Sequence, residues 1–203
     1  MTKIIFLDHD GVICLSHNWG SRFKKASKYF EKNGIPDYSE MASNEGRRPL
    51  EIRFDNFDEK AIKTLNQILE ETGAEIVVSS DWKRYADVEE MGKYYEMQGI
   101  IKKPIAFTPD LNHCTNYDIE NFEWTPKWDL EQSRSIEIKE YLHLNPDVTH
   151  WVAIDDLNMA KKIKDGNRTY THSWGLDNFV FTPKSSEGIK QSGVKAKILK
   201  FLQ

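Results

Sequence analysis

Three runs of large apolar residues, each without polar alternation, stand out along the chain, within residues 3–7, 75–78 and 151–154. Strands that are covered on both faces, as in a parallel α/β sheet, have this continuous apolar pattern. Apolar residues at helical spacing predict helices over residues 58–71, 133–144 and 194–202. Alternating strands and helices predict the α/β class, as a three-layer sandwich around a doubly wound, mainly parallel sheet.

The remaining segments do not follow this alternation of strands and helices as clearly. We expect a short helix over residues 158–164, ended by an Asp-Gly pair, and a fourth parallel strand over residues 169–172. Residues 15–55 and 100–131 are long connections with many aromatic side chains, and such connections are often lids or binding loops. The 203 residues are therefore expected to form a single domain with two insertions.

Two carboxylates end the first apolar run. Asp8 and Asp10 follow it directly, and Gly11 comes next. Side chains two positions apart on an extended segment point to the same side, and ligands of open α/β sheets bind beyond the carboxyl ends of the strands. Two like charges this close are costly unless a cation or a shared proton relieves them. The pair indicates a functional site, and a solvated acidic turn is the alternative.

The other two apolar runs also end in polar side chains. Ser79 and Ser80 follow the second run, and Asp155 and Asp156 end the third. Core packing alone would scatter polar residues at both ends of the strands. A site assembled from the carboxyl ends of neighbouring parallel strands explains all three, although a serine or an aspartate there can also cap the next helix.

The ordered set of DxDG, strand-Ser, a basic residue and strand-Asp-Asp resembles the haloacid dehalogenase (HAD) superfamily of phosphohydrolases, over about residues 3–175. The stretches FLDHDGVI, TGAEIVVSSDWKR, SRSIEIKEYL and WVAIDDLN resemble, more narrowly, the HAD domain of Swiss-army-knife RNA repair proteins. This resemblance implies a HAD-like, Rossmannoid fold, a small cap within residues 15–55, and a Mg²⁺-dependent phosphatase that forms an aspartyl-phosphate.

The resemblance also implies roles for the carboxylates. Asp8 would be the nucleophile, and Asp10 would protonate the leaving oxygen and then activate water. Asp8, Asp155 and Asp156, with the backbone carbonyl of Asp10, would hold Mg²⁺; either member of the acidic pair can be the direct ligand, and we favour Asp156. Gly11 would let the chain turn so that backbone N–H groups face phosphate, although an ordinary turn glycine fits equally well.

Phosphate-binding side chains are implied in the same way. Ser79 would bind the transferred phosphoryl group, with Ser80 as the alternative. Arg134 would offset the phosphoryl charge from the start of its helix, where the superfamily usually has Lys. Lys127 and Lys139 are the alternatives for this cation.

The first insertion suggests a substrate class. Residues 19–34 carry five basic residues against one acidic residue, a local charge of +4, with four aromatic residues between them. This is the pattern of a surface for single-stranded nucleic acid, and its basic members are Arg22, Lys24, Lys25, Lys28 and Lys32. An amphipathic cap helix with inward aromatics and solvated lysines is the alternative.

We therefore expect a phosphatase for nucleotides or for the 3′-phosphate ends of RNA or DNA. A small-molecule phosphatase and a catalytically silent module that binds phosphorylated ends are the alternatives. The net charge of −4 argues against an overall basic nucleic-acid binder but allows a local basic patch. No apolar run approaches the roughly 18 residues of a membrane span, no signal peptide is expected, and two cysteines form no disulfide framework, so we expect a cytoplasmic protein.

Overall fold

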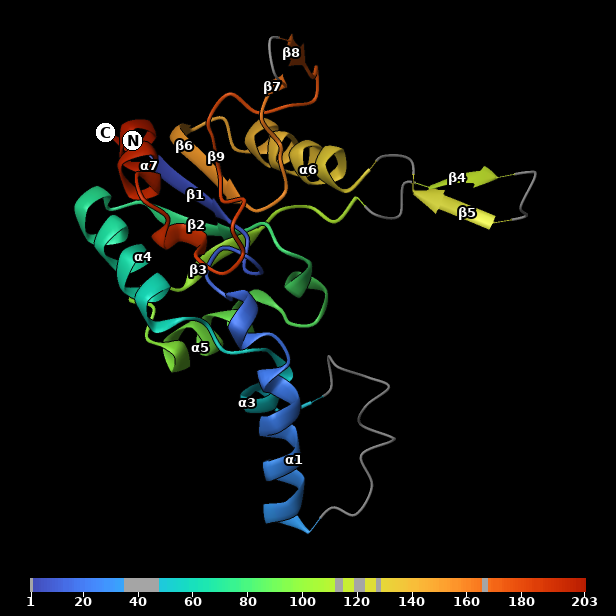
Figure 1. Ribbon diagram of the computed structural model, residues 1–203, viewed down its shortest axis with the longest axis vertical. Helices are drawn as coiled ribbons and strands as arrows, with labels where there is room; N and C mark the ends of the chain where they lie inside the picture. Colours follow the sequence, from blue (N-terminus) through green and yellow to red (C-terminus); the bar gives the residue numbers. More distant parts are fainter. Residues whose placement is uncertain (1, 35–47, 112–114, 119–122, 127–128, 166–167) are drawn as a thin grey trace.

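A computed structural model describes residues 2–34, 48–111, 115–118, 123–126, 129–165 and 168–203. Its centre is a sheet of five parallel strands in the order β3-β2-β1-β6-β9 (Figure 1). These strands are β1 (Thr2–Leu7), β2 (Glu75–Val78), β3 (Pro104–Phe107), β6 (Val148–Asp155) and β9 (Phe179–Phe181). The strand order reverses between β1 and β6, which is where ligands of doubly wound sheets bind.

Helices cover both faces of this sheet (Figure 1). One face carries α4 (Glu59–Thr72), α5 (Val88–Gln98) and α7 (Val194–Leu202), and the other carries α6 (Leu130–Leu144). Asp58 caps the start of α4, since its side chain accepts a hydrogen bond from the Ala61 amide, and Gly73 in the left-handed conformation caps its end. The predicted three-layer α/β sandwich is confirmed.

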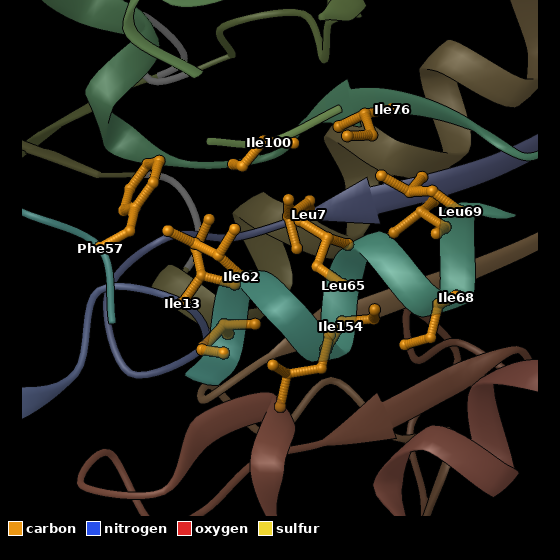
Figure 2. Packing of buried hydrophobic residues seen from close by; sticks show 14 of the residues in the cluster. Leu7, Ile13, Phe57, Ile62, Leu65, Ile68, Leu69, Ile76, Ile100 and Ile154 are labelled. Carbon is orange, nitrogen blue, oxygen red and sulfur yellow. The ribbon is translucent and has the colours of Figure 1, made fainter. Parts of the chain in front are cut away.

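The continuous apolar pattern of β1 follows from these two layers. Ile5 and Leu7 pack into the cluster under α4, part of which Figure 2 shows, whereas Ile4 and Phe6 pack toward α6. All four side chains are fully buried. Because neighbouring side chains of a strand point to opposite faces, a strand between two helical layers needs apolar residues at every position.

The first insertion holds the 3-10 helix η1 (Ser16–Asn18), α1 (Ser21–Asn33) and α3 (Leu50–Arg53). Ala26 and Phe30 of α1 pack on Ile52 of α3, and α1 extends away from the sheet (Figure 1). The prediction that residues 100–131 are only a connection is wrong in part. Residues 104–107 form β3 of the main sheet, and β4 (Thr115–Asp118) pairs with β5 (Glu123–Pro126) as an antiparallel hairpin.

The predictions for residues 158–164 and 169–172 are also wrong. The structure has an antiparallel hairpin there, β7 (Lys162–Asp165) with β8 (Arg168–Thr171), and this hairpin lies outside the main sheet. A helix does not form because the amides of Lys161 and Leu176 donate across to Leu176 and Met159, in an extended pairing. The last parallel strand is β9 instead. Within the described residues, no helix is long and apolar enough to cross a membrane.

Candidate active site

Polar residues follow or end all five parallel strands at one edge of the sheet. Their amides continue the ladder between strands: the N–H groups of Asp8, Ser79, Thr108 and Thr182 donate to carbonyls of Ile154, Leu7, Val78 and Asp155, at 2.9–3.1 Å. The regular pairing of the strands therefore brings their polar ends to one level. The sequence indicated three of these ends, and it missed those at Thr108 and Thr182 because β3 and β9 have no long apolar run.

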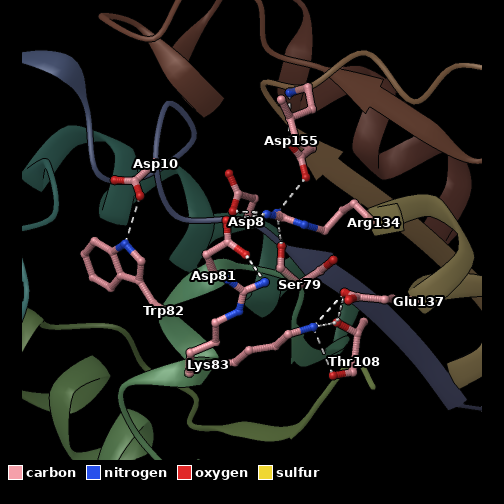
Figure 3. Close-up of polar contacts among 12 residues, drawn as sticks. Asp8, Asp10, Ser79, Asp81, Trp82, Lys83, Thr108, Arg134, Glu137 and Asp155 are labelled. Carbon is pink, nitrogen blue, oxygen red and sulfur yellow. Dashed lines mark hydrogen bonds and ion pairs between the residues drawn. The ribbon is translucent and has the colours of Figure 1, made fainter. Parts of the chain in front are cut away.

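Arg134 gathers the predicted groups around its guanidinium (Figure 3). Its Nη1 atom donates to Asp8 Oδ1 at 2.9 Å, to Asp155 Oδ2 at 3.1 Å and to the Ser79 carbonyl at 2.6 Å. Its Nη2 atom lies 3.6 Å from Asp81 Oδ2. The side chain is only 6% exposed, so this is an interior cation. Burial opposes its charge, but the carboxylates of Asp155 and Asp8 more than offset this and raise the pKa of Arg134.

Three carboxylates meet beside this arginine. Oxygen atoms of Asp8, Asp155 and Asp156 all lie within 4.8 Å of one another. Burial raises the pKa of Asp8 to about 6, with the Asp10 charge adding to it and Arg134 opposing it. Burial, followed by repulsion from Asp8, raises the pKa of Asp155 and of Asp156. One arginine thus leaves negative charge in excess, and hard carboxylate oxygens at this spacing fit a Mg²⁺ ion.

The two members of the acidic pair differ in what they already bind. Asp155 accepts from Arg134 through Oδ2 and from the Leu157 amide through Oδ1, at 2.8 Å. Asp156 accepts from the Ser185 hydroxyl at 3.3 Å. The Asp156 carboxylate is half-buried and has more capacity left for an ion, and the choice of Asp156 as the direct ligand stays our prediction.

Gly11 packs directly against Asp156 of this acidic pair. Its φ of +68° is in the left-handed region, and a Cβ atom added to it would lie 2.0 Å from Asp156 Oδ2. A larger residue would therefore displace the Asp156 carboxylate. The Gly11 amide donates to the Cys14 carbonyl at 2.9 Å, so its own N–H is engaged in the turn and does not face a phosphate.

The two serines are both buried, and they differ in their contacts. Ser79 Oγ has no hydrogen-bond partner among the described residues, although buried hydroxyls almost always have one. Ser80 lines a cavity of about 140 Å³ together with Asp8, Asp10 and Arg134. The unpartnered hydroxyl favours Ser79 and the cavity lining favours Ser80, so the choice between them stays a prediction.

Asp10 lines the same cavity as Asp8 and Asp156 but does not belong to the three-carboxylate cluster. Its Oδ2 atom accepts a hydrogen bond of 2.8 Å from the indole Nε1 of Trp82 (Figure 3). Burial raises the pKa of Asp10, and the bond from Trp82 partly opposes this rise. Trp82 is a residue that the sequence interpretation left without a role, although it directly follows the two serines and Asp81 in the chain.

The basic residues of α1 fall into two groups. Arg22 lies 3.6 Å from Asp55 through Nη1, and Lys25 Nζ donates to Asn56 Oδ1 at 2.9 Å, so both contact the segment that follows α3. Lys24 and Lys28 are exposed. Of the alternatives to Arg134, Lys139 donates to the Ser173 carbonyl rather than to the acidic cluster.

Lys127, the other alternative, lies outside the described residues.

The aromatic side chains of the first insertion are also divided. Phe30 is buried, whereas Trp19 and Phe23 are 49% and 46% exposed. The inward packing expected of an amphipathic cap helix therefore holds for only part of this segment.

A Rossmannoid sheet whose carboxyl edge carries a DxD pair, a serine, a buried basic residue and an acidic pair defines a HAD domain. The family model for the HAD domain in Swiss Army Knife RNA repair proteins matches residues 4–194, so the chain belongs to this family. Membership supports a function of the phosphohydrolase type. No curated protein and no solved structure matches the chain.

Proposed function

We propose that this protein is a Mg²⁺-dependent phosphatase that forms an aspartyl-phosphate on Asp8. The observation that carries the proposal is the position of Asp8, which accepts a hydrogen bond from Arg134 and has an oxygen within 4.8 Å of carboxylate oxygens of Asp155 and Asp156. A nucleophile for phosphoryl transfer needs compensating positive charge on both sides of the transferred group. Arg134 supplies one cation, and the carboxylates supply oxygen ligands for a second.

The residues support a two-step reaction. In the first step, an Asp8 oxygen bonds to phosphorus and the bond to the leaving oxygen breaks, while Asp10 gives that oxygen its proton. In the second step, Asp10 takes a proton from water as the water attacks phosphorus, which releases phosphate and regenerates Asp8. Arg134 and a serine hydroxyl hold the phosphoryl oxygens throughout. When bound to Asp8, Asp156 and their neighbours, Mg²⁺ would neutralise the charge of the phosphoryl group.

We further propose that the substrate is a 3′-phosphate end of single-stranded RNA or DNA. The exposed ammonium groups of Lys24 and Lys28 suit backbone phosphates, and the exposed rings of Trp19 and Phe23 suit unstacked bases. These side chains belong to the first insertion, which lies between the Asp8–Asp10 segment and α4. The family description, a domain of RNA repair proteins, supports the same substrate class.

A substrate screen with the purified protein tests this proposal. The panel holds para-nitrophenyl phosphate, sugar phosphates, mononucleotide 3′-phosphates, and oligonucleotides phosphorylated at either end. We expect Mg²⁺-dependent phosphate release, lost with EDTA, and highest kcat/KM on the oligonucleotide 3′-phosphate. Asp8→Asn should be inactive, and Asp177→Asn, which changes an exposed carboxylate paired with Lys161, should be fully active.

Each alternative has its own signature in this screen. A small-molecule phosphatase would show equal or higher kcat/KM on a sugar phosphate or mononucleotide, without sensitivity to salt. A catalytically silent module would bind the phosphorylated oligonucleotide and release no phosphate from any member of the panel. Full activity in Asp8→Asn would contradict the mechanism itself.

A further inference from the structure

The indole of Trp82 is held between two parallel rings. The Phe54 ring stacks on it with centroids 4.8 Å apart and planes 8° apart, and the Phe57 ring stacks with centroids 5.4 Å and planes 16° apart. The side chain is only 5% exposed. A ring stacked in this way on two others can neither tilt nor rotate without loss of contact, so the direction of its N–H bond is fixed.

That N–H bond points at the Asp10 carboxylate. The donor and acceptor atoms are 2.8 Å apart, at the short end of the range for an N–H···O bond (Figure 3). The indole N–H is buried and must have an acceptor, because an unpaired buried donor costs about 1–3 kcal/mol. The bond therefore fixes the rotation of the Asp10 carboxylate and the direction in which its other oxygen faces.

The stacked rings are anchored to two separate parts of the chain. Phe54 and Phe57 belong to the segment between α3 and α4, and Trp82 belongs to the 3-10 helix η3 (Asp81–Arg84) directly after the two serines. Arg53 ties these parts together, since its Nη1 donates to the Tyr85 carbonyl at 3.0 Å and to Glu90 at 2.7 Å. Tertiary packing thus orients the Asp10 carboxylate through Trp82, in addition to the hydrogen bond that this carboxylate makes with the Cys14 side chain in its own loop.

We infer that Trp82 is a positioning residue for Asp10, which holds the carboxylate where it can exchange a proton with the leaving oxygen and with water. This inference rests on the proposed phosphatase function. Trp82 needs no contact with substrate to act in this way. In the competing explanation, the three rings are ordinary core packing and Asp10 only satisfies the indole N–H.

The dependence of kcat/KM on the leaving group separates these explanations. A good leaving group such as para-nitrophenolate departs without a proton, whereas the alkoxide of a nucleoside 3′-phosphate needs one, and general acid catalysis contributes about 10²–10⁴-fold. Trp82→Phe keeps an aromatic ring in the stack and removes the donor. We expect it to lower kcat/KM roughly tenfold or more on the nucleoside ester and less than about twofold on para-nitrophenyl phosphate.

The second chemical step gives an independent readout. Asp10 must also activate water, so Trp82→Phe should slow the hydrolysis of the phospho-enzyme and produce a pre-steady-state burst of para-nitrophenolate. Trp151→Phe is the matched control. Trp151 packs edge-on against Phe6, toward the opposite face of the sheet, and its replacement should leave the leaving-group dependence of the wild type unchanged.

A variant with 3-benzothienylalanine at position 82 removes only the N–H group, because sulfur replaces it in a ring of the same shape. It should reproduce the kinetics of Trp82→Phe with the melting temperature of the wild type nearly retained. Equal losses on both esters, or wild-type kinetics in the benzothienyl variant, would overturn this inference while the proposed function stands. An inactive wild type would overturn the proposed function and this inference with it.

Discussion

Two buried ion clusters share the helix α6, and they are built differently. Arg134 contacts Asp8 and Asp155 at 2.9 and 3.1 Å, with Asp81 at 3.6 Å, so three carboxylates surround one cation. One turn further along the helix, Glu137 pairs with Lys83 at 2.6 Å, one anion to one cation. The Lys83 ammonium also donates to Thr108 and to the Pro109 carbonyl (Figure 3).

The difference in charge balance distinguishes a structural ion pair from the cluster at the candidate site. The Lys83–Glu137 pair is balanced in charge and its ammonium has several acceptors, so it needs no ligand and joins α6 to η3 and to the end of β3. The Arg134 cluster holds an excess of negative charge. Burial raises the pKa of Asp8 and of Asp155, and a neighbouring carboxylate adds to each rise, Asp10 for Asp8 and Asp8 for Asp155. A buried cluster with excess negative charge destabilises the folded protein when it is empty, and a bound cation with a phosphoryl group relieves this cost.

Breaking the balanced pair should have the largest effect on stability. Lys83→Met leaves a buried carboxylate unpaired, so we expect the free energy of unfolding to fall by about 3–5 kcal/mol. The double variant Lys83→Met/Glu137→Leu should regain most of this loss, because two apolar side chains need no partners. Urea denaturation of the three proteins measures both values. A single variant as stable as the wild type would show that the pair has no structural role.

Removal of the cation from the unbalanced cluster should act on catalysis. Arg134→Met should lower kcat by about 10²–10³-fold, the usual cost of losing one group that stabilises transition-state charge. Arg134→Lys should retain more activity, because it keeps the charge in the position where the superfamily usually has Lys. Steady-state kinetics on para-nitrophenyl phosphate gives the comparison. Equal activity in Arg134→Met and the wild type would show that Arg134 has no role in catalysis.

The sequence predicted the unbalanced cluster better than the balanced one. Asp8, Ser79 and Asp155 lie at the ends of continuous apolar runs, so local pattern and the order of the motifs were enough to place them together. Glu137 and Lys83 lie 54 positions apart on two helical segments, and nothing local indicates that they pair. The stacking of Trp82 between Phe54 and Phe57 was missed for the same reason.

The elements of the fold that the sequence did not predict also depend on contacts between distant segments. The strands β1, β2 and β6 are central and read as apolar runs, whereas β3 begins with a proline and β9 has only three residues. Both form the outer positions of the sheet, where pairing to a neighbour outweighs the weak local signal. Extended pairing between residues 159–161 and 172–176 likewise overrides the helical pattern of residues 158–164.

Metal binding should relieve the unbalanced cluster in a pH-dependent way. At about 100 times its Kd, Mg²⁺ should stabilise the folded state by about 2.7 kcal/mol, or roughly 5–10 °C in melting temperature for a chain of this size. The raised pKa of Asp8 means that the folded protein keeps a proton that the unfolded chain releases between about pH 4 and 6. Without metal, this group therefore makes stability fall as the pH rises through that window.

Protons and Mg²⁺ compete for the same oxygens, so the thermal shift should be larger at pH 7.5 than at pH 5. Asp156→Asn should reduce the shift, and Asp177→Asn should leave it unchanged. Differential scanning fluorimetry with Mg²⁺ and EDTA at both pH values measures this. An equal shift in Asp156→Asn and the wild type would place the ion elsewhere.

The smallest expected effect concerns the cap. Lys24→Glu/Lys28→Glu should lower kcat/KM on an oligonucleotide 3′-phosphate about tenfold at low salt. It should also flatten the salt dependence, because a protein with fewer phosphate contacts releases fewer counterions on binding. Hydrolysis of para-nitrophenyl phosphate should be unchanged. Lys197→Glu/Lys200→Glu on α7 is a matched change of two exposed lysines far from the first insertion in the chain. Equal effects of the two double variants would show that the lysines of α1 act only through the overall charge of the protein and not by contact with the strand.

The central claim is that Asp8 carries the phosphoryl group, and trapping it is the most direct test. The enzyme is mixed with para-nitrophenyl phosphate and Mg²⁺, quenched in acid and reduced with borohydride, which converts an aspartyl-phosphate into homoserine. Peptide mass spectrometry then locates the modified residue. We expect homoserine at position 8 in the wild type, more of it in Trp82→Phe, and none in Asp8→Asn. A phosphorylated residue other than Asp8 in an enzyme that turns over would contradict the account.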